Sequence, residues 1–164
     1  MKPKQLPKEI VDLLLPRLSD EYIAFYFYRA AANWCQNVGF EKAAEYFAAE
    51  SADELTHAQK IEKYLVDWNV TPQLPKVESP QLDFKDLVEV IELAYKLEYD
   101  LYEEYEETSG KVFKEGDYCT FDFLQPLRSI QTQSVIEYSD KLNMLEGINR
   151  GSKFELLTIE KKLF

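Results

Sequence analysis

Cysteine, glycine and histidine are all scarce in this chain of 164 residues. The two cysteines, Cys35 and Cys119, are too few for a disulfide framework, so we expect a reducing, cytoplasmic setting. Only five glycines occur, while leucine, glutamate, alanine and lysine recur, which favours a mostly helical protein. The single histidine, His57, closes the pattern Glu54-Leu55-Thr56-His57, in which a carboxylate and an imidazole stand three residues apart.

Positive charge is also in short supply, with 19 basic against 30 acidic residues and a formal net charge of −11. This balance argues against direct binding to nucleic acid or to an anionic membrane, because both need basic patches. Residues 1–21 contain only a short apolar run with an acid inside it, which fits neither a signal peptide nor a membrane span. The length and the 46% of hydrophobic residues predict one folded domain, residues 1–164.

Apolar residues recur at alternating steps of three and four along most of the chain, which predicts helices. Pro7 suits a helix start, Pro16 is expected to kink the early turns, and Gly110 is expected to cap a helix end. Gly39 separates the first two helices by a short link, so they should be antiparallel neighbours. The expected helices cover residues 7–37, 40–68, 85–110 and 119–147, followed by a short fifth helix within 152–164.

Between the second and third helices, residues 69–84 contain three prolines and read as an extended connection. At about 3.3 Å per residue this segment reaches about 50 Å, whereas a helix of about 28 residues is about 42 Å long. The connection can therefore run the whole length of a bundle and start the third helix parallel to the second. We predict an all-α four-helix bundle with one long crossover and a short C-terminal fifth helix.

The expected core stripe of every long helix is apolar at both ends and polar in the middle. Unpaired carboxylates are costly to bury, and several together need a cation or a proton between them. A bound metal ion supplies that charge. The polar residues in mid-stripe are Glu21 and Tyr28 on the first helix, Glu50, Glu54 and His57 on the second, Glu98 on the third, and Gln131 and Ser134 on the fourth.

Residues three apart on a helix share a face, so Glu54 and His57 can bind one metal ion, and both ligand types suit iron. Di-iron bundles take one Glu from each of two helices and a Glu-x-x-His from each of the other two. Here Glu21 and Glu98 are the single acids, and the fourth helix offers neutral side chains in the equivalent spacing. Any one of these residues has an ordinary explanation as a surface acid or a core tyrosine. Their joint occurrence on three helices favours a metal site.

With these residues in place, the chain resembles the ferritin family over nearly its whole length, and non-haem bacterial ferritins most. The resemblance implies a ferritin-like fold, a diiron ferroxidase centre and iron storage in a homo-oligomeric cage of 24 subunits. The segments that carry it are Asn33-Trp34-Cys35, Glu54-Leu55-Thr56-His57, Val77-Glu78-Ser79-Pro80, Tyr95-Lys96-Leu97-Glu98, Asp117-Tyr118 and Thr120-Phe121-Asp122-Phe123-Leu124-Gln125.

The resemblance also implies roles for single residues. Glu21, Glu54 and His57 would hold the first iron, with Glu54 bridging, and Glu98 with Gln131 would hold the second. In the same way, Tyr28 would act as an electron donor or hydrogen-bonding partner beside the centre, and Glu50 would serve a third, transient iron site.

Two positions depart from the bacterial pattern. Ser134 stands where many bacterial ferritins have a glutamate, and with Gln131 it looks more like an animal heavy-chain ferritin. The second iron would then have fewer charged ligands and be held loosely, as suits an ion that moves on to storage. Pro126, near the start of the fourth helix, is expected to distort the neighbouring channel region.

Two relatives fit less well. Bacterioferritin binds haem through a methionine just after the bridging Glu, where this chain has Leu55, so no haem is expected. It also has a second Glu-x-x-His, which this chain lacks. A DNA-protecting miniferritin is disfavoured by the tail after Gly147 and by the lack of a basic arm.

Three functions stay open from the sequence. The first is iron storage with oxidation of Fe(II) by dioxygen or peroxide. The second is a cage with a weak centre that stores iron passively, because Gln131 and Ser134 carry no charge. The third is a di-iron oxidase that does not store iron, which the C-terminal tail and the single Glu-x-x-His disfavour.

Overall fold

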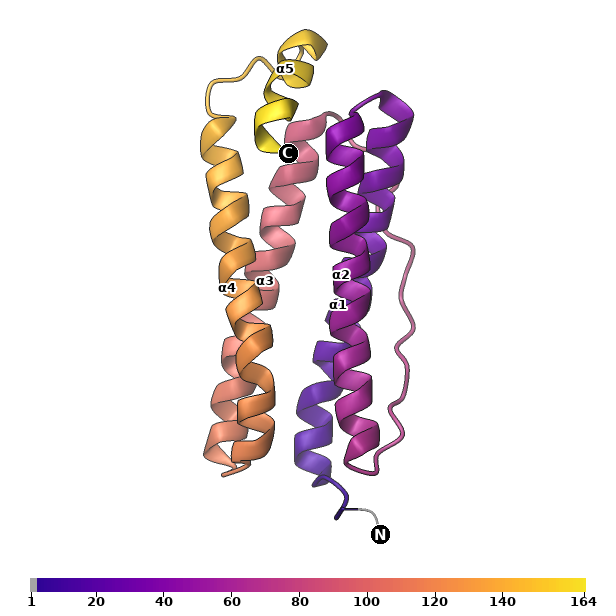
Figure 1. Cartoon of the computed structure of the whole chain (residues 1–164), viewed down its shortest axis with the longest axis vertical. Helices are drawn as coiled ribbons and strands as arrows, with labels where there is room; N and C mark the ends of the chain where they lie inside the picture. Colours follow the sequence, from indigo (N-terminus) through magenta and orange to yellow (C-terminus); the bar gives the residue numbers. More distant parts are fainter. Residues whose placement is uncertain (1–2) are drawn as a thin grey trace.

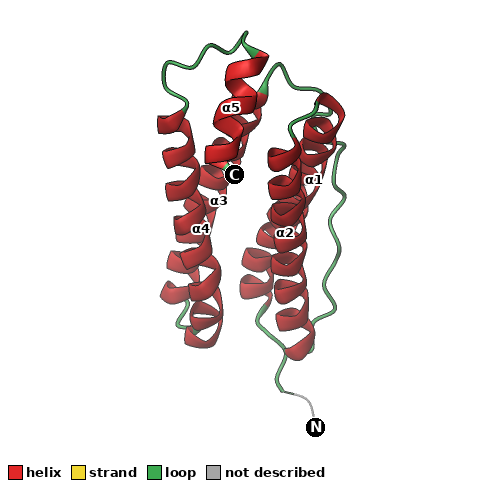
Figure 2. Cartoon of the chain, turned by 45° about the horizontal axis from the view of Figure 1, so that its top comes forward, coloured by secondary structure: helices red, strands yellow, loops and turns green. Residues whose placement is uncertain are grey.

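The structure, a computed structural model, describes residues 3–164 and shows five α-helices with no strand in that range (Figure 2). All five predicted helices are confirmed. Their bounds are α1 Lys8–Val38, α2 Glu41–Asp67, α3 Leu87–Lys114, α4 Tyr118–Met144 and α5 Lys153–Leu163.

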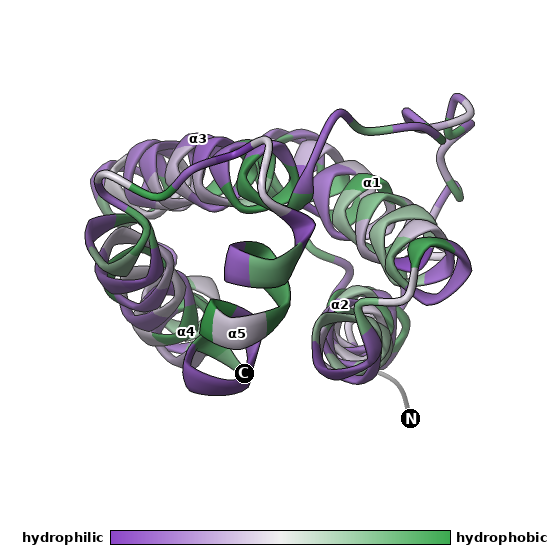
Figure 3. Cartoon of the chain, turned by 90° about the horizontal axis from the view of Figure 1, so that it is seen from above, coloured by the Kyte–Doolittle hydropathy of each residue, from purple (hydrophilic) through white to green (hydrophobic). Residues whose placement is uncertain are grey.

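The long crossover passes along the side of the bundle next to α1 and α2, from one end to the other (Figure 1). It leaves α2 and α3 parallel, as predicted, and α4 returns antiparallel to α3. Seen from above, α1 and α2 form one side of the bundle and α3 and α4 the other, while α5 lies over one end (Figure 3). The fold is the predicted four-helix bundle with a fifth helix across one end.

Local sequence explains where the helices begin and end. Gly39 takes a left-handed backbone (φ 83°), which lets the chain reverse sharply between α1 and α2. The carboxylates of Asp86 and Asp117 accept backbone N–H groups at the starts of α3 and α4. The guanidinium of Arg150 donates to Asp86 and Glu92, which fastens the link between α4 and α5 to the start of α3.

Two predicted helix ends were wrong. Helix α4 ends at Met144, before the predicted residue 147. Helix α3 continues through Gly110 for another turn, and its C-cap is Glu115. A glycine inside a helix costs about 1 kcal/mol relative to alanine. Full burial of the Val112 side chain in the extra turn offsets that cost. Pro16 and Pro126 both lie inside their helices, since α1 continues past Pro16 and α4 past Pro126. No helix within residues 3–164 is long and apolar enough to cross a membrane.

The core consists of two apolar clusters with a polar layer between them. Tyr28, Phe47 and Ile91 belong to the cluster nearer α5, and Leu14 and Ile61 to the one at the opposite end. The buried charged and amide side chains of the stripes lie along the helices between these sets, as the sequence predicted. The apolar clusters on both sides of the polar layer hold it in place.

Candidate metal centre

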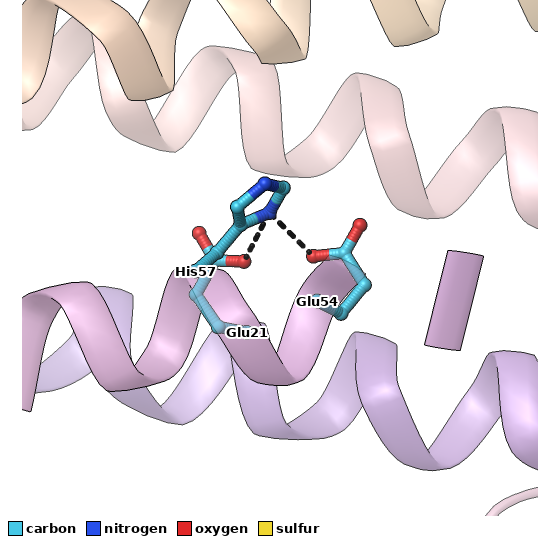
Figure 4. Close-up of side chains that lie close together, drawn as sticks. All are labelled: Glu21, Glu54 and His57. Carbon is cyan, nitrogen blue, oxygen red and sulfur yellow. Dashed lines mark hydrogen bonds and ion pairs between the residues drawn. The ribbon is translucent and has the colours of Figure 1, made fainter. Parts of the chain in front are cut away.

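Three of the predicted ligands converge in the polar layer. Glu21, Glu54 and His57 each offer one ligand atom, and these atoms all lie within 4.8 Å of one another. The Nδ1 atom of His57 is 3.3 Å from Glu54 Oε2 and 3.5 Å from Glu21 Oε2 (Figure 4). Helix α1 supplies the first acid and α2 supplies the other two residues, so the pairing of these helices creates the group.

The surrounding ligand candidates are also removed from solvent. Glu21 and Glu98 are fully buried, Glu54 is 4% exposed and Gln131 is 1% exposed. Three atoms of this set are buried and make no hydrogen bond among residues 3–164. They are Glu98 Oε2, Gln131 Oε1 and Glu21 Oε2, the last of which has only its 3.5 Å ion pair with His57. Buried oxygens normally have partners, so buried oxygens that make no hydrogen bond fit a cation as their missing partner.

Two buried tyrosines explain why one oxygen of each acid is left over. Tyr105 Oη donates a hydrogen bond to Glu21 Oε1, and Tyr28 Oη donates one to Glu98 Oε1. Each tyrosine therefore fixes one carboxylate oxygen and leaves Oε2 free to bind an ion. The role of Tyr105 was not predicted. The signal that could have found it is its hydroxyl, which needs a hydrogen-bond partner at a fully buried position.

The protonation of the group follows from burial and from its mutual contacts. Burial lowers the pKa of His57, but its contacts with Glu21 and Glu54 outweigh that effect and raise the pKa to about 10. Burial raises the pKa of Glu54 well above its usual range, although His57 opposes the shift. Without a metal ion, protons thus supply the positive charge that the buried acids require.

The α3 and α4 side of the centre is less charged. Burial raises the pKa of Glu98 to about 7, against the hydrogen bond from Tyr28, which lowers it. Gln131 is neutral, and the half-buried Ser134 lies one turn further along α4. Glu98 is not part of the tight group of three ligands. The second predicted site therefore has one carboxylate of its own.

Glu50 lies one turn before Glu54 on α2 and is half-buried. Burial and the nearby Glu137 raise its pKa to about 7. It too lies outside the group of three, and its predicted role in a third iron site stays a prediction.

Comparison with known proteins identifies the family of the chain. Residues 11–148 match the family model "Ferritin-like domain". A probable bacterial non-heme ferritin-like protein of Haemophilus influenzae is 32% identical, covering 96% of this chain and 95% of that protein. The bacterial non-heme ferritin of Escherichia coli is 30% identical, covering 94% and 98%.

Solved structures show the same fold. An open pore ferritin from the hyperthermophilic archaeon Archaeoglobus fulgidus superposes with a TM-score of 0.89 at 22% identity, over 97% of both chains. A humanized archaeal ferritin gives the same TM-score at 21% identity, over 97% of this chain and 96% of that one. By its family match and by its curated relatives, the chain belongs to the ferritin family and resembles the bacterial non-haem ferritins.

Proposed function

We propose that this protein stores iron and oxidises Fe(II) to Fe(III) at a centre for two irons before storage. The observation that carries the proposal is the set of buried oxygens without partners on Glu21 and Glu98, next to Glu54 and His57. These groups would destabilise a purely structural core, because burying each carboxylate costs folding free energy unless an ion or a hydrogen bond compensates it. Carboxylate and imidazole ligands suit iron as the substrate.

The first iron binds Glu21, Glu54 and His57. To act as a ligand, His57 gives up the proton that its raised pKa otherwise retains, and Glu54 becomes a carboxylate. The ion then replaces those protons as the positive charge between the acids. Glu54 bridges to the second iron, and the hydrogen bond from Tyr105 keeps Glu21 oriented toward the first.

The second iron binds Glu98 and Gln131 in addition to the bridging Glu54. Only Glu98 adds a new negative charge, so we expect this ion to be held loosely and to leave for storage after oxidation. Carboxylates favour the harder Fe(III) over Fe(II). Glu50, one turn away on the same helix as the bridge, is our candidate ligand for a third, transient ion.

Two neighbouring Fe(II) ions can pass two electrons to one molecule of dioxygen or peroxide, which avoids one-electron radical products. Tyr28 touches Glu98 through its hydroxyl and lies close enough to the centre to donate an electron or a hydrogen bond. The surrounding apolar clusters keep bulk water away from both ligand sets.

Storage requires a container, and we propose a homo-oligomeric cage of 24 subunits that holds ferric oxyhydroxide. The ferritin names of its relatives, the full-length match to ferritin structures and the presence of α5 support this assembly. The net charge of −11 suits the attraction of Fe(II). The thiols of Cys35 and Cys119 are both free, which suits a reducing compartment such as the cytoplasm.

Passive storage is the second candidate, and the neutral Gln131 and Ser134 favour it. If the second iron were bound too weakly, the cage would admit and hold iron without fast oxidation. No haem site is proposed, since Leu55 stands where a haem ligand would be required by the resemblance.

Oxygen consumption on mixing with Fe(II) separates the two candidates. We compare the native protein, Glu98→Gln, and the control Glu103→Gln, which makes the same change at an exposed position of α3. A ferroxidase should lose at least about tenfold in rate with Glu98→Gln, or about 1.4 kcal/mol in barrier, and nothing with the control. Equally slow oxidation in all three proteins would favour the passive store, and equally fast oxidation would mean that the proposed centre is wrong. The mass in solution tests the cage independently.

A further inference from the structure

One buried arginine ties the two sides of the bundle together next to the candidate centre. Arg17 on α1 is 4% exposed. Its Nη1 atom donates to Glu104 Oε2 at 2.7 Å and to Thr108 Oγ1 at 3.3 Å, both on α3. Its Nη2 atom pairs with Asp20 Oδ2 on α1 at 2.8 Å. Helix α1 belongs to one side of the bundle and α3 to the other, so this guanidinium bridges the interface between them (Figure 3).

The two acids that Arg17 holds stand directly before the two residues of a contact at the centre. Asp20 precedes Glu21, and Glu104 precedes Tyr105. The hydroxyl of Tyr105 donates to Glu21 Oε1, which leaves Glu21 Oε2 for an ion. Neighbouring residues of a helix move together, because backbone hydrogen bonds fix their relative positions. By holding Asp20 and Glu104, Arg17 therefore fixes the distance across which Tyr105 reaches Glu21.

Neither packing nor charge accounts for an arginine at this position. A buried ion pair is often no more stable than apolar residues of similar volume. A guanidinium also repels cations, so its charge works against the binding of Fe(II) nearby. The Nε atom of Arg17 is buried and makes no hydrogen bond among residues 3–164, which adds to the cost of burial. What an apolar side chain cannot do is hold two acids at once, and the planar fork of a guanidinium does.

The tyrosine that Arg17 places stays a hydrogen-bond donor. Burial raises the pKa of Tyr105 well above its usual range, and Glu21 adds to that shift. Arg17 opposes the shift without overcoming it, so Tyr105 keeps its proton. Its hydroxyl therefore continues to donate to Glu21 Oε1 and holds that carboxylate in one orientation.

We propose that Arg17 is a positioning residue for the first iron, which acts through Tyr105 on Glu21. The inference rests on the proposed function, in which Glu21, Glu54 and His57 bind that ion. Removing a hydrogen-bond partner of a metal ligand typically weakens metal binding by about 10- to 100-fold, because the partner orients the ligand. Loss of Arg17 should therefore weaken binding of the first ion. Removal of a repelling positive charge alone would have the opposite effect.

Anaerobic titration with Co(II), followed by its visible absorption, tests this role in the assembled protein. We compare the native chain with Arg17→Gln, Tyr105→Phe and the double variant that carries both changes. Each single variant should bind the first Co(II) about tenfold more weakly. The double variant should bind no more weakly than Tyr105→Phe, because Arg17 acts through that tyrosine. For the same reason, Arg17→Gln should give the visible spectrum of Tyr105→Phe.

A second variant leaves Arg17 in place and removes only its acid partner on α3. Glu104→Ala makes this change at an exposed position, so no buried charge loses all its partners. The matched control Glu103→Ala makes the same change at the neighbouring exposed position. Glu104→Ala should bind the first Co(II) about tenfold more weakly, and the control should bind it as the native protein does. Circular dichroism and mass in solution verify that the variants fold and assemble.

Three results would refute the role of Arg17. The first is that Arg17→Gln binds the first Co(II) as tightly as the native protein or more tightly. The second is that its loss of affinity adds to that of Tyr105→Phe in the double variant. The third is that Glu104→Ala matches Glu103→Ala, which decides the question even if Arg17→Gln does not fold. A native protein that binds no Co(II) is a different result and refutes the candidate centre itself.

Discussion

The two halves of the candidate metal centre differ in charge and in how closely their ligand atoms lie together. On the α1 and α2 side, Glu21, Glu54 and His57 bring their ligand atoms within 4.8 Å of one another. On the α3 and α4 side, Glu98 is the one charged residue, accompanied by Gln131 and the half-buried Ser134. Glu98 and Gln131 are as deeply buried as Glu21 and Glu54, so burial of the ligands does not explain the difference. The difference lies in how many acids each helix pair contributes.

A tight half and a loose half suit different tasks. The half with two carboxylates and an imidazole can retain an ion, because the binding of that ion relieves the repulsion of buried acids. The half with one carboxylate has less to gain from its ion and should exchange it more readily. In a storage protein the first position would then be occupied early and the second would pass iron on.

The largest expected effect comes from removing the shared acid. Glu54→Gln keeps the shape but takes away a buried charged ligand of both ions, and we expect about a hundredfold weaker Co(II) binding, or about 2.7 kcal/mol. Anaerobic titration followed by the visible absorption of Co(II) measures it. The control Asp53→Asn makes the same change at an exposed neighbour and should bind normally. Similar losses in both variants would mean that Glu54 has no special role.

The pH dependence should separate the two halves. Burial raises the pKa of Glu98 to about 7, so binding of the second ion displaces a proton only below that pH. Its affinity should fall about tenfold for each pH unit below about 7 and level off above it. Burial lowers the pKa of His57, but its contacts with Glu21 and Glu54 outweigh that effect and raise the pKa to about 10. His57 therefore holds its proton across this pH range. The affinity for the first ion should therefore keep rising as the pH increases above 7.

Co(II) titrations at a series of pH values, with Glu98→Gln as the comparison, test this contrast. In Glu98→Gln, the plot of the affinity for the second ion against pH should lose its change of slope near pH 7. The affinity for the first ion should depend on pH as in the native protein. Parallel pH profiles for the two ions in the native protein would contradict the assignment of Glu98 to the second half.

The smallest effect should come from adding an acid to the loose half. Ser134→Glu places a carboxylate one turn after Gln131, and we expect about fivefold tighter binding of the second ion, or about 1 kcal/mol. Because Ser134 is only half-buried, solvent screens part of the gain. Ser129→Glu, on the same helix, serves as the control for added charge. An equal gain in both variants would show that general electrostatics, and not ligation, tightens the site.

The bundle could be predicted because its causes are local. Apolar spacing fixed the helices, and the length of the crossover was enough to set α2 parallel to α3. The end of α3 could not be predicted from Gly110, because burial of Val112 in the following turn decided it. A sequence pattern shows that glycine disfavours the interior of a helix, but it does not show the tertiary packing that overrides this preference.

The candidate site shows the same division. The sequence by itself placed Glu21, Glu54, His57 and Glu98 in mid-stripe, because helical periodicity determines which side chains face the core. Only the tertiary structure decided that three of them form a tight group and that Tyr105 holds Glu21 as Tyr28 holds Glu98. It alone also stacked Tyr138 on Tyr28, since contacts between helices depend on how their faces meet in space, which the spacing along one helix does not specify.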